Sequence, residues 1–312
     1  MKSILITGAS GFVGRNLLKE LVKLNKYNIT AIFRKKEKDL SEVVNQFIVE
    51  DLVNFQDYSQ SLKSPNYMIH LAGIAHKKKV NKADFDLINV DITAKLLKWS
   101  KEKQVERFIY LSSVGVNGQL SKEPFNENDK PNPKEYYAIS KLLAENKIIK
   151  NINQNEITKY VIIRSPLIYG CNAPGNFRLL QKWINSPFPL PFGMVNNKRS
   201  IISINNLIDF IKLTLNHKNA SNQIFLVSDP VPISTRDLVN KLIKSQNSLF
   251  KNLKIPKSIL MFILTILNKK NLANKILGSL EIDWRKSSAL LGWKPPFNTS
   301  DELEKTITGQ YD

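Results

Sequence analysis

Cysteine and histidine are scarce in this chain. Its 312 residues contain a single cysteine, Cys171, and three histidines. One cysteine excludes an intramolecular disulfide and any zinc site built from several cysteines. None of the histidines stands at metal-ligand spacing from another histidine or from the cysteine. We therefore expect no metal site, and the sparing use of cysteine is typical of a reducing compartment such as the cytoplasm.

A secretory signal pattern and long apolar runs are missing as well. The first residues pass directly into a strand-like run, without the basic, apolar and small-residue succession of a signal peptide. The longest apolar run, residues 259–267, is shorter than the ~20 residues of a membrane-spanning helix. Lys257, Lys269 and Lys270 flank it. It is either a helix packed in a second lobe, which we favour, or a helix that associates weakly with a membrane surface.

Acidic residues are outnumbered, and the formal net charge is +19. A basic balance of this size suits nucleic acid, an anionic membrane or an acidic ligand. The basic residues are scattered, however, with short clusters only at residues 34–36 and 77–79. No basic surface interleaved with aromatic residues can be recognised in the sequence, so we expect no nucleic-acid partner.

Strand-like apolar runs alternate with helix-like segments in the first half of the chain. Strands are expected at residues 2–7, 28–33, 46–49, 67–71, 107–112 and 159–164. Helices are expected at residues 12–24, 81–102 and 134–150. This alternation predicts a doubly wound parallel sheet of the α/β class, with ligand-binding residues just after the carboxyl ends of the strands.

The pattern changes after residue 164. Five prolines and three glycines between residues 165 and 199 predict long irregular loops that cover a binding site. A helix near 205–216 and a strand near 223–228 return to the sheet, and residues 229–312 are expected to be mostly helical. We therefore assign residues 1–164, with 205–228 returning, to a nucleotide-binding domain, and residues 165–204 and 229–312 to a smaller second lobe.

A glycine-rich loop follows the first expected strand. It consists of Gly8, Ala9, Ser10, Gly11, Phe12, Val13 and Gly14. Three glycines at this spacing, between a strand and a helix, allow a tight turn and close approach of a pyrophosphate to the free N–H groups of the helix. The loop predicts a dinucleotide cofactor, with its residues in contact with it.

The end of the second strand bears on the choice of cofactor. An acidic residue usually binds the adenosine ribose there, but this chain has Arg34, which is suited to a 2′-phosphate. NADP(H) is therefore favoured over NAD(H), although an arginine after a strand is also a common surface residue. Asp51 and Leu52, after the third strand, either hold the adenine or begin the next segment with an ordinary aspartate cap.

Tyr137 and Lys141 are four residues apart and so share one face of the helix expected at 134–150. An ammonium beside a phenol favours the phenolate, so we expect a lowered pKa for Tyr137 and proton exchange with a substrate oxygen. Ser113, at the end of the strand expected at 107–112, can donate a hydrogen bond to the same oxygen. Alone, each feature is equally typical of surface or capping residues; together they indicate a catalytic site.

These motifs give the chain a clear resemblance to the extended short-chain dehydrogenase/reductase family of NAD(P)-dependent nucleotide-sugar epimerases and dehydratases. The resemblance runs through "TGASGFVG" at 7–14, "HLAG" at 70–73, "INVDITAKLL" at 88–97, "RFIYLSSVGVNG" at 107–118, "YYAISKLLAE" at 136–145, "IIRSPLIYG" at 162–170 and "LLGWKPP" at 290–296. It implies a Rossmann-type domain with a substrate lobe, and Ser113, Tyr137 and Lys141 as the catalytic triad. Further cofactor contacts are implied for Leu71, Ala72, Gly73, Pro166 and the triad residues Tyr137 and Lys141.

The resemblance also implies a UDP-sugar substrate. Asn176, Phe192 and Arg199 match the family's diphosphate and uracil contacts, while Ser113 and Tyr137 face the sugar. Each of these three residues also has an ordinary structural alternative. Asn176 could form a loop turn, Phe192 could pack in the core, and Arg199 could be a solvated surface charge. Leu167 stands where many epimerases have Asn, and Val116-Asn117-Gly118 where many have Val-Tyr-Gly.

These departures resemble a subgroup of bacterial UDP-4-keto-6-deoxy-N-acetylhexosamine 4-reductases and UDP-glucose 4-epimerase-like proteins. The implied function is NAD(P)-dependent reduction at C4 of such a sugar in surface-polysaccharide synthesis. A UDP-hexose or UDP-N-acetylhexosamine 4-epimerase is the first alternative, and a non-catalytic dinucleotide-binding regulator is the second. The resemblance further implies a homodimer that pairs the helices expected at 81–102 and 134–150.

Overall fold

The computed structural model describes residues 1–40, 43–75, 81–184, 186, 188–245 and 252–309. Its centre is a seven-stranded sheet in the order β3-β2-β1-β4-β5-β6-β9, in which every neighbouring pair is parallel. The strands are β1 (Lys2–Thr7), β2 (Tyr27–Phe33), β3 (Asn45–Ile48), β4 (Tyr67–His70), β5 (Arg107–Ser113), β6 (Lys159–Ser165) and β9 (Gln223–Leu226). The predicted parallel α/β fold is confirmed.

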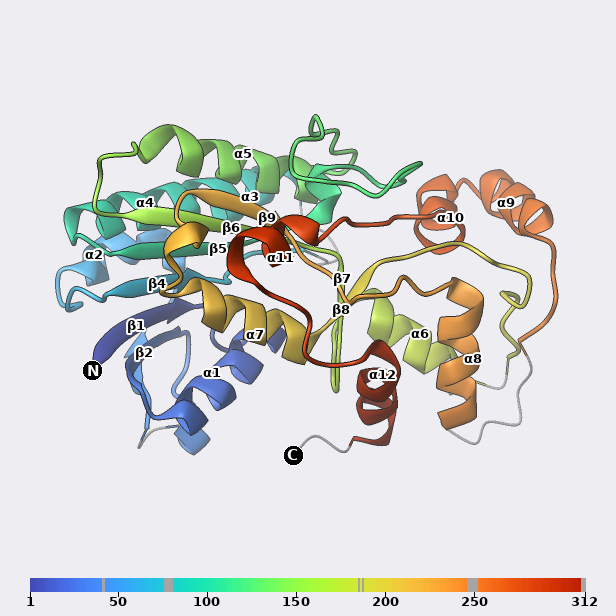
Figure 1. Cartoon of the computed structure of the whole chain (residues 1–312), viewed down its shortest axis with the longest axis horizontal. Helices are drawn as coiled ribbons and strands as arrows, with labels where there is room; N and C mark the ends of the chain where they lie inside the picture. The colour runs from blue at the N-terminus through green and yellow to red at the C-terminus, as the bar shows by residue number, and fades with distance from the viewer. Residues whose placement is uncertain (41–42, 76–80, 185, 187, 246–251, 310–312) are drawn as a thin grey trace.

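Helices cover both faces of the sheet (Figure 1). One face carries α1 (Phe12–Leu24) and α7 (Ile204–Thr214), and the other carries α2 (Phe55–Ser59), α4 (Ile92–Glu102) and α5 (Tyr136–Asn151). Helix α1 shows why these segments fold as they do. Its Leu17, Leu18 and Leu21 lie on one face and are completely buried, which stabilises the fold by roughly 1.5–3 kcal/mol for each side chain.

The helix expected at 81–102 is interrupted. It consists of α3 (Lys82–Phe85), a π-helical segment η3 (Asp86–Asp91) and α4. The wider turn places the buried Asn89 side chain against residue 74, where its Oδ1 accepts from the Ile74 N–H at 2.9 Å. Asn89 Nδ2 also donates to Ser140 Oγ of α5 at 2.9 Å. The interruption thus fastens α5 and the segment after β4 to each other.

The loops expected at 165–199 contain more regular structure than predicted. Strand β7 (Leu167–Tyr169) pairs with β8 (Ile201–Ser203), and α6 (Asn176–Ile184) lies between them in the chain. Prolines surround α6 but none lies within it, and Phe177, Leu180 and Ile184 follow the helical period and face the core of the lobe. The local periodicity outweighs the composition of the segment.

The segment after β9 is mostly helical, as predicted. Its helices are α8 (Thr235–Ser245), α9 (Lys257–Ile266), α10 (Lys270–Leu277), α11 (Arg285–Leu291) and α12 (Thr299–Thr308). The short 3₁₀ turns of the chain are η1 (Lys38–Leu40), η2 (Leu52–Asn54), η4 (Val114–Val116) and η5 (Lys218–Ala220). After α11, Trp293 packs on Phe210 of α7 with ring centroids 4.8 Å apart, so the C-terminal segment reaches back to the core under the sheet. None of the helices in the described residues combines the length and the apolar character needed to cross a membrane.

His70 lies fully buried at the end of β4, between two threonine hydroxyls. Its Nδ1 is 2.7 Å from Thr7 Oγ1, and its Nε2 is 2.9 Å from Thr93 Oγ1. The Thr93 hydroxyl donates its own proton to the Asn89 carbonyl oxygen, so the ring donates from Nε2 and accepts at Nδ1. This is the neutral imidazole, and burial, helped by the charge of Lys141, lowers the pKa of His70 to about 3.

The unfolded chain therefore binds a proton at His70 more readily than the folded protein does. As the pH falls from 6.5 towards about 3, this residue should reduce the free energy of unfolding by up to ~1.4 kcal/mol per pH unit. Urea unfolding on both sides of pH 6.5 measures this slope, and His70→Gln should flatten it. Parallel slopes for the two proteins would show that His70 does not carry the effect.

Candidate active site

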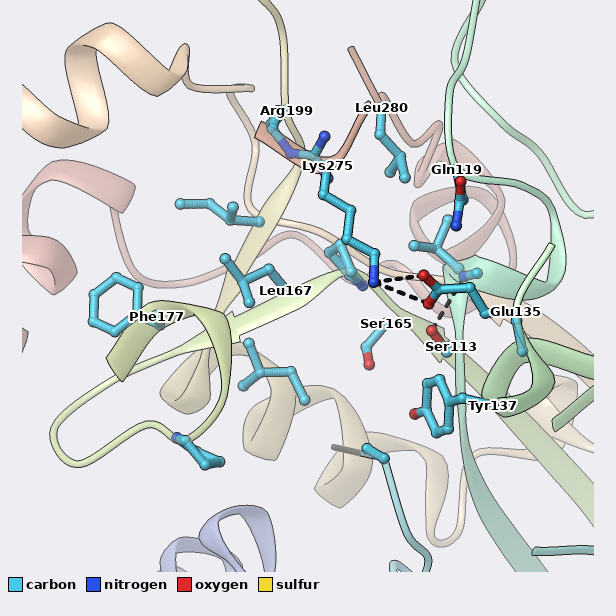
Figure 2. A pocket seen from close by; sticks show the side chains of 18 of the residues that line it. Ser113, Gln119, Glu135, Tyr137, Ser165, Leu167, Phe177, Arg199, Lys275 and Leu280 are labelled. Carbon is cyan, nitrogen blue, oxygen red and sulfur yellow. Dashed lines mark hydrogen bonds and ion pairs between the residues drawn. The ribbon is translucent and has the colours of Figure 1, made fainter. Parts of the chain in front are cut away.

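A cavity of about 690 Å³ opens at the carboxyl edge of the sheet and extends into the lobe. The glycine loop lines one end of it, and the ends of β5 and β6 with the start of α5 line the middle. Residues of α6 and α10 close the lobe side (Figure 2). The cavity therefore lies where a doubly wound sheet is expected to hold its ligand.

Ser113 and Tyr137 lie together in this cavity, as the sequence predicts. Ser113 ends β5, Tyr137 is the second residue of α5, and their side chains are hydrogen-bonded. The Ser113 Oγ also accepts from the Gly115 N–H at 3.1 Å, which fixes the serine side chain. The neighbouring Tyr136 is 59% exposed, so the helix turns only one of its two adjacent tyrosines inward.

The predicted electrostatic relation between Tyr137 and Lys141 is wrong for this structure. Burial raises the pKa of Tyr137 to about 12, and the Ser113 hydrogen bond offsets it only in part. Lys141 Nζ donates to the Leu111 carbonyl oxygen at 2.8 Å and lies 4.5 Å from the centre of the Tyr110 ring. Burial also lowers the pKa of this lysine, to about 8. Desolvation is the largest cause of the pKa shift for both groups.

A buried ion pair holds α5 against the sheet. Glu145, one turn after Lys141, accepts from Arg164 of β6, with Nη2 2.6 Å from Oε2 and Nε 3.0 Å from Oε1. Ser112 Oγ donates to the same carboxylate at 2.5 Å. The two charged side chains are 1% and 3% exposed. The helix face that presents Tyr137 and Lys141 is therefore fastened to the two strands at the cavity floor.

The glycine loop fits a dinucleotide diphosphate. Gly8 has φ +74°, and a Cβ there would lie 2.5 Å from the Ala72 nitrogen. A Cβ on Gly14 would lie 2.3 Å from the Gly8 carbonyl oxygen, so close backbone packing excludes any side chain. Gly11 begins α1 without a side-chain cap among the described residues, and the first turn of α1 has no acidic residue. The free N–H groups of this first turn lie at the end of the cavity lined by the glycine loop, where they suit an anion.

The predicted cofactor residues divide into two groups. The cavity wall includes Gly8, Gly11, Phe12, Val13, Gly14, Leu71, Gly73, Tyr137, Lys141 and Pro166. The wall does not include Ser10, Arg34, Asp51, Leu52 or Ala72. Asp51 caps η2, since its Oδ1 accepts from the Val53 N–H at 3.0 Å, which is the alternative kept open for it. Arg34 is exposed just after β2.

Two of the three predicted nucleotide-sugar contacts line the cavity. Arg199 Nη1 donates to the Gly278 carbonyl oxygen at 3.1 Å, and burial lowers the pKa of its guanidinium to about 10. Within the described residues no carboxylate forms an ion pair with it, so an anionic ligand would supply the missing charge. Phe192 is 4% exposed and packs edge-on against Trp183. Asn176 begins α6, but its side chain lies outside the described residues.

Several lining residues were not found from the sequence. Lys275 of α10 reaches across the cavity to Glu135, just before α5, with Nζ 2.7 Å from Oε1 and 2.9 Å from Oε2. In Figure 2 this pair spans the space above Ser113 and Tyr137. Trp183 of α6 also lines the wall and is 38% exposed, which leaves part of its ring for contact with a base. The described residues contain no cluster of three or more potential metal ligands.

Comparisons with known proteins find similar chains and structures. The model of the NAD dependent epimerase/dehydratase family matches residues 4–228. The UDP-glucose 4-epimerase of Vibrio cholerae is 32% identical, over 98% of this chain and 94% of the relative. The dTDP-4-dehydro-6-deoxyglucose reductase of Escherichia coli is 24% identical, over 97% and 96%. The crystal structure of UDP-glucuronic acid 4-epimerase from Bacillus cereus with UDP-glucuronic acid and NAD has a TM-score of 0.78, at 24% identity, covering 99% of this chain and 100% of that one.

The ion pair between Glu145 and Arg164 makes a stability prediction. Glu145→Gln leaves the arginine charge buried without its carboxylate, so the free energy of unfolding should fall by about 3–5 kcal/mol. Glu102→Gln is the matched control, because its pair with Lys98 is 3.9 Å long and exposed; it should change stability by less than about 0.5 kcal/mol. Urea unfolding of both variants tests this, and equal effects would contradict the role given to the buried pair.

Proposed function

The chain belongs to the NAD dependent epimerase/dehydratase family, and from this we propose that it transfers a hydride at C4 of a UDP-sugar. The favoured reaction is reduction of a UDP-4-keto-6-deoxy-N-acetylhexosamine, as in surface-polysaccharide synthesis. The observation that carries the proposal is the hydrogen-bonded Ser113–Tyr137 pair, which lines one cavity together with Lys141, the glycine loop and Arg199. A non-catalytic regulator would have no need of this arrangement.

The residues divide the chemistry as follows. The dinucleotide, held by the glycine loop and Lys141, supplies the hydride. Tyr137 donates its proton to the C4 oxygen, and Ser113 orients that oxygen by a hydrogen bond. Arg199 binds the diphosphate, and Phe192 with Trp183 contacts the base. Burial raises the pKa of Tyr137 to about 12, so the phenol is protonated at neutral pH, which is the form that protonation of a ketone oxygen requires.

A 4-epimerase is the second candidate. It would use the same three residues, without net consumption of cofactor. The relative with 32% identity is a UDP-glucose 4-epimerase, which supports epimerisation, whereas the relative with 24% identity is a reductase. Epimerisation starts with removal of a hydroxyl proton, for which the pKa of Tyr137 has to fall.

The domain division and a homodimer are part of the same proposal. Residues 1–164 with 205–228 hold the dinucleotide, and residues 165–204 with 229–312 hold the sugar nucleotide, apart from α11 and Trp293, which pack against the sheet. Pairing of two copies through α4 and α5 is supported by exposed apolar side chains of α5, where Leu143 is 41% and Ile149 37% exposed.

Absorbance of the reduced nicotinamide distinguishes the two reactions. Stoichiometric oxidation with a UDP-4-keto-6-deoxy-N-acetylhexosamine supports the reductase, whereas conversion of UDP-glucose or UDP-N-acetylglucosamine to its 4-epimer without net oxidation supports the epimerase. In either case Tyr137→Phe should lower turnover by about 10²–10⁴-fold, because the proton donor is lost. Tyr136→Phe, at the exposed neighbour, should leave turnover unchanged. Full activity of the Tyr137 variant would remove the assigned proton donor.

Arg34 makes a separate prediction about the cofactor. Arg15, the nearby cation on α1, is already paired with Glu37 at 2.8 Å, which leaves the exposed Arg34 to meet a 2′-phosphate. NADPH should bind more tightly than NADH, and Arg34→Ala should weaken NADPH by about 10–100-fold while NADH is unchanged. Fluorescence titration measures the dissociation constants of both cofactors. Lys19→Ala, on the solvent side of α1, is the control and should leave both constants unchanged. Equal loss for the two cofactors would contradict the preference.

A further inference from the structure

Helix α9 presents a continuous apolar stripe to solvent. The stripe consists of Ile259, Phe262, Ile263 and Ile266, which are 47%, 66%, 45% and 67% exposed. Their spacing of three, one and three residues places them on one face of the helix. Leu267, which is 56% exposed, extends the stripe past the end of α9. The opposite face is packed, because Leu260, Met261 and Leu264 contact the core of the lobe.

The lobe therefore holds α9 firmly while its outer side remains apolar. In Figure 1, α9 lies at the far end of the lobe from the seven-stranded sheet, next to α10. Single exposed apolar residues are normal on a protein surface, but a contiguous set on one short helix marks an interaction site. The packing expected for residues 259–267 explains one face of the helix and leaves the other face without a partner among the residues that the structure describes.

The charges around the stripe indicate its partner. Between Asp237 and Glu281 the sequence has no acidic residue, and it has eight lysines, at positions 241, 244, 251, 254, 257, 269, 270 and 275. Of these, Lys275 is paired with Glu135 in the cavity. Lys257 begins α9, and Lys269 and Lys270 follow it; all three are exposed. An apolar stripe bounded by cations fits an anionic lipid surface, where acyl chains receive the apolar residues and headgroups meet the ammonium groups. Two copies of this face would instead bring like charges together.

We propose that the α9 stripe and its flanking lysines dock the protein on an anionic membrane surface. The helix, with ten residues, lies in the plane of the interface and does not cross the bilayer. Helix α10 packs beside α9 and contributes Leu272 and Lys275 to the cavity wall, so docking holds the sugar-binding side of the cavity close to the lipid. Docking depends only on this surface, so the proposal holds whether the protein is a reductase or an epimerase.

Sedimentation with lipid vesicles tests the proposal. The full chain should bind vesicles of equal parts phosphatidylcholine and phosphatidylglycerol, bind phosphatidylcholine vesicles much more weakly, and dissociate as salt is raised. Phe262→Ser with Ile266→Ser should lower partitioning by about tenfold or more. The matched control is Val43→Ser with Ile157→Ser, two positions that are each 57% exposed and belong to the sheet domain; it should bind like the parent protein.

A second variant separates charge from apolar contact and keeps the stripe intact. Lys269→Gln with Lys270→Gln should weaken binding to the anionic vesicles several-fold and leave the weak binding to phosphatidylcholine unchanged. Circular dichroism and turnover without vesicles should match the parent protein for every variant, which distinguishes loss of docking from misfolding and from any failure of the proposed reaction.

Three results would overturn the proposal. The first is absence of vesicle binding by the parent protein, and the second is equal binding by the parent and the Phe262/Ile266 variant. The third is a parent dimer, measured by sedimentation velocity without lipid, that becomes monomeric in the same variant while neither protein binds vesicles. In that case a second copy of the chain covers the stripe.

Discussion

The buried contact of Glu145 with Arg164 and Ser112 is the constraint on which the geometry of the candidate active site depends. A carboxylate on the helix, a guanidinium on β6 and a hydroxyl on β5 meet at one point beneath the cavity. Because Tyr137, Lys141 and Glu145 are spaced four residues apart, they form one line along α5. Fixing the last of them therefore fixes the direction in which the first two point, and the paired register of Ser112 with Arg164 brings Ser113 to the same place.

Burial has two consequences at this site. The first concerns the ion pair of Glu145 with Arg164: removal of either partner is costly, because it leaves a buried charge without solvent. The second concerns the cavity, where burial raises the pKa of Tyr137 and lowers the pKa of Lys141. An argument from charge alone predicts a phenolate, because it places the ammonium next to the phenol and neglects the solvent that both have lost. The lysine is held instead by the Leu111 carbonyl and the Tyr110 ring. The protein thus keeps a neutral phenol hydrogen-bonded to the serine.

The sequence was sufficient where local pattern and fold point the same way. The strand, glycine loop and helix over residues 2–24 and the parallel character of the sheet follow from apolar runs and from their alternation with helices. The meeting of Ser113 with Tyr137 follows from the position of each residue on its predicted element. It was insufficient where contacts join distant segments. Glu145 and Arg164 each look like ordinary charged residues, and Lys275 meets Glu135 across 140 positions. The π-helical turn at 86–91 needs the contact of Asn89 with residue 74, which no helical period reveals.

Charge and apolar exposure have to be considered together to understand the far end of the lobe. A chain-wide excess of lysine accounts for a basic surface anywhere on the protein. The whole chain has 46 basic and 27 acidic residues, and at this ratio a segment with eight lysines would also contain about five acidic residues. Residues 238–280 have none, so this segment departs from the composition of its own chain. The same segment carries α9, whose packed face shows that the helix belongs to the fold and whose outer face the fold does not use. A general bias in composition explains scattered lysines; it does not explain why acids are missing where four apolar side chains share one exposed helix face.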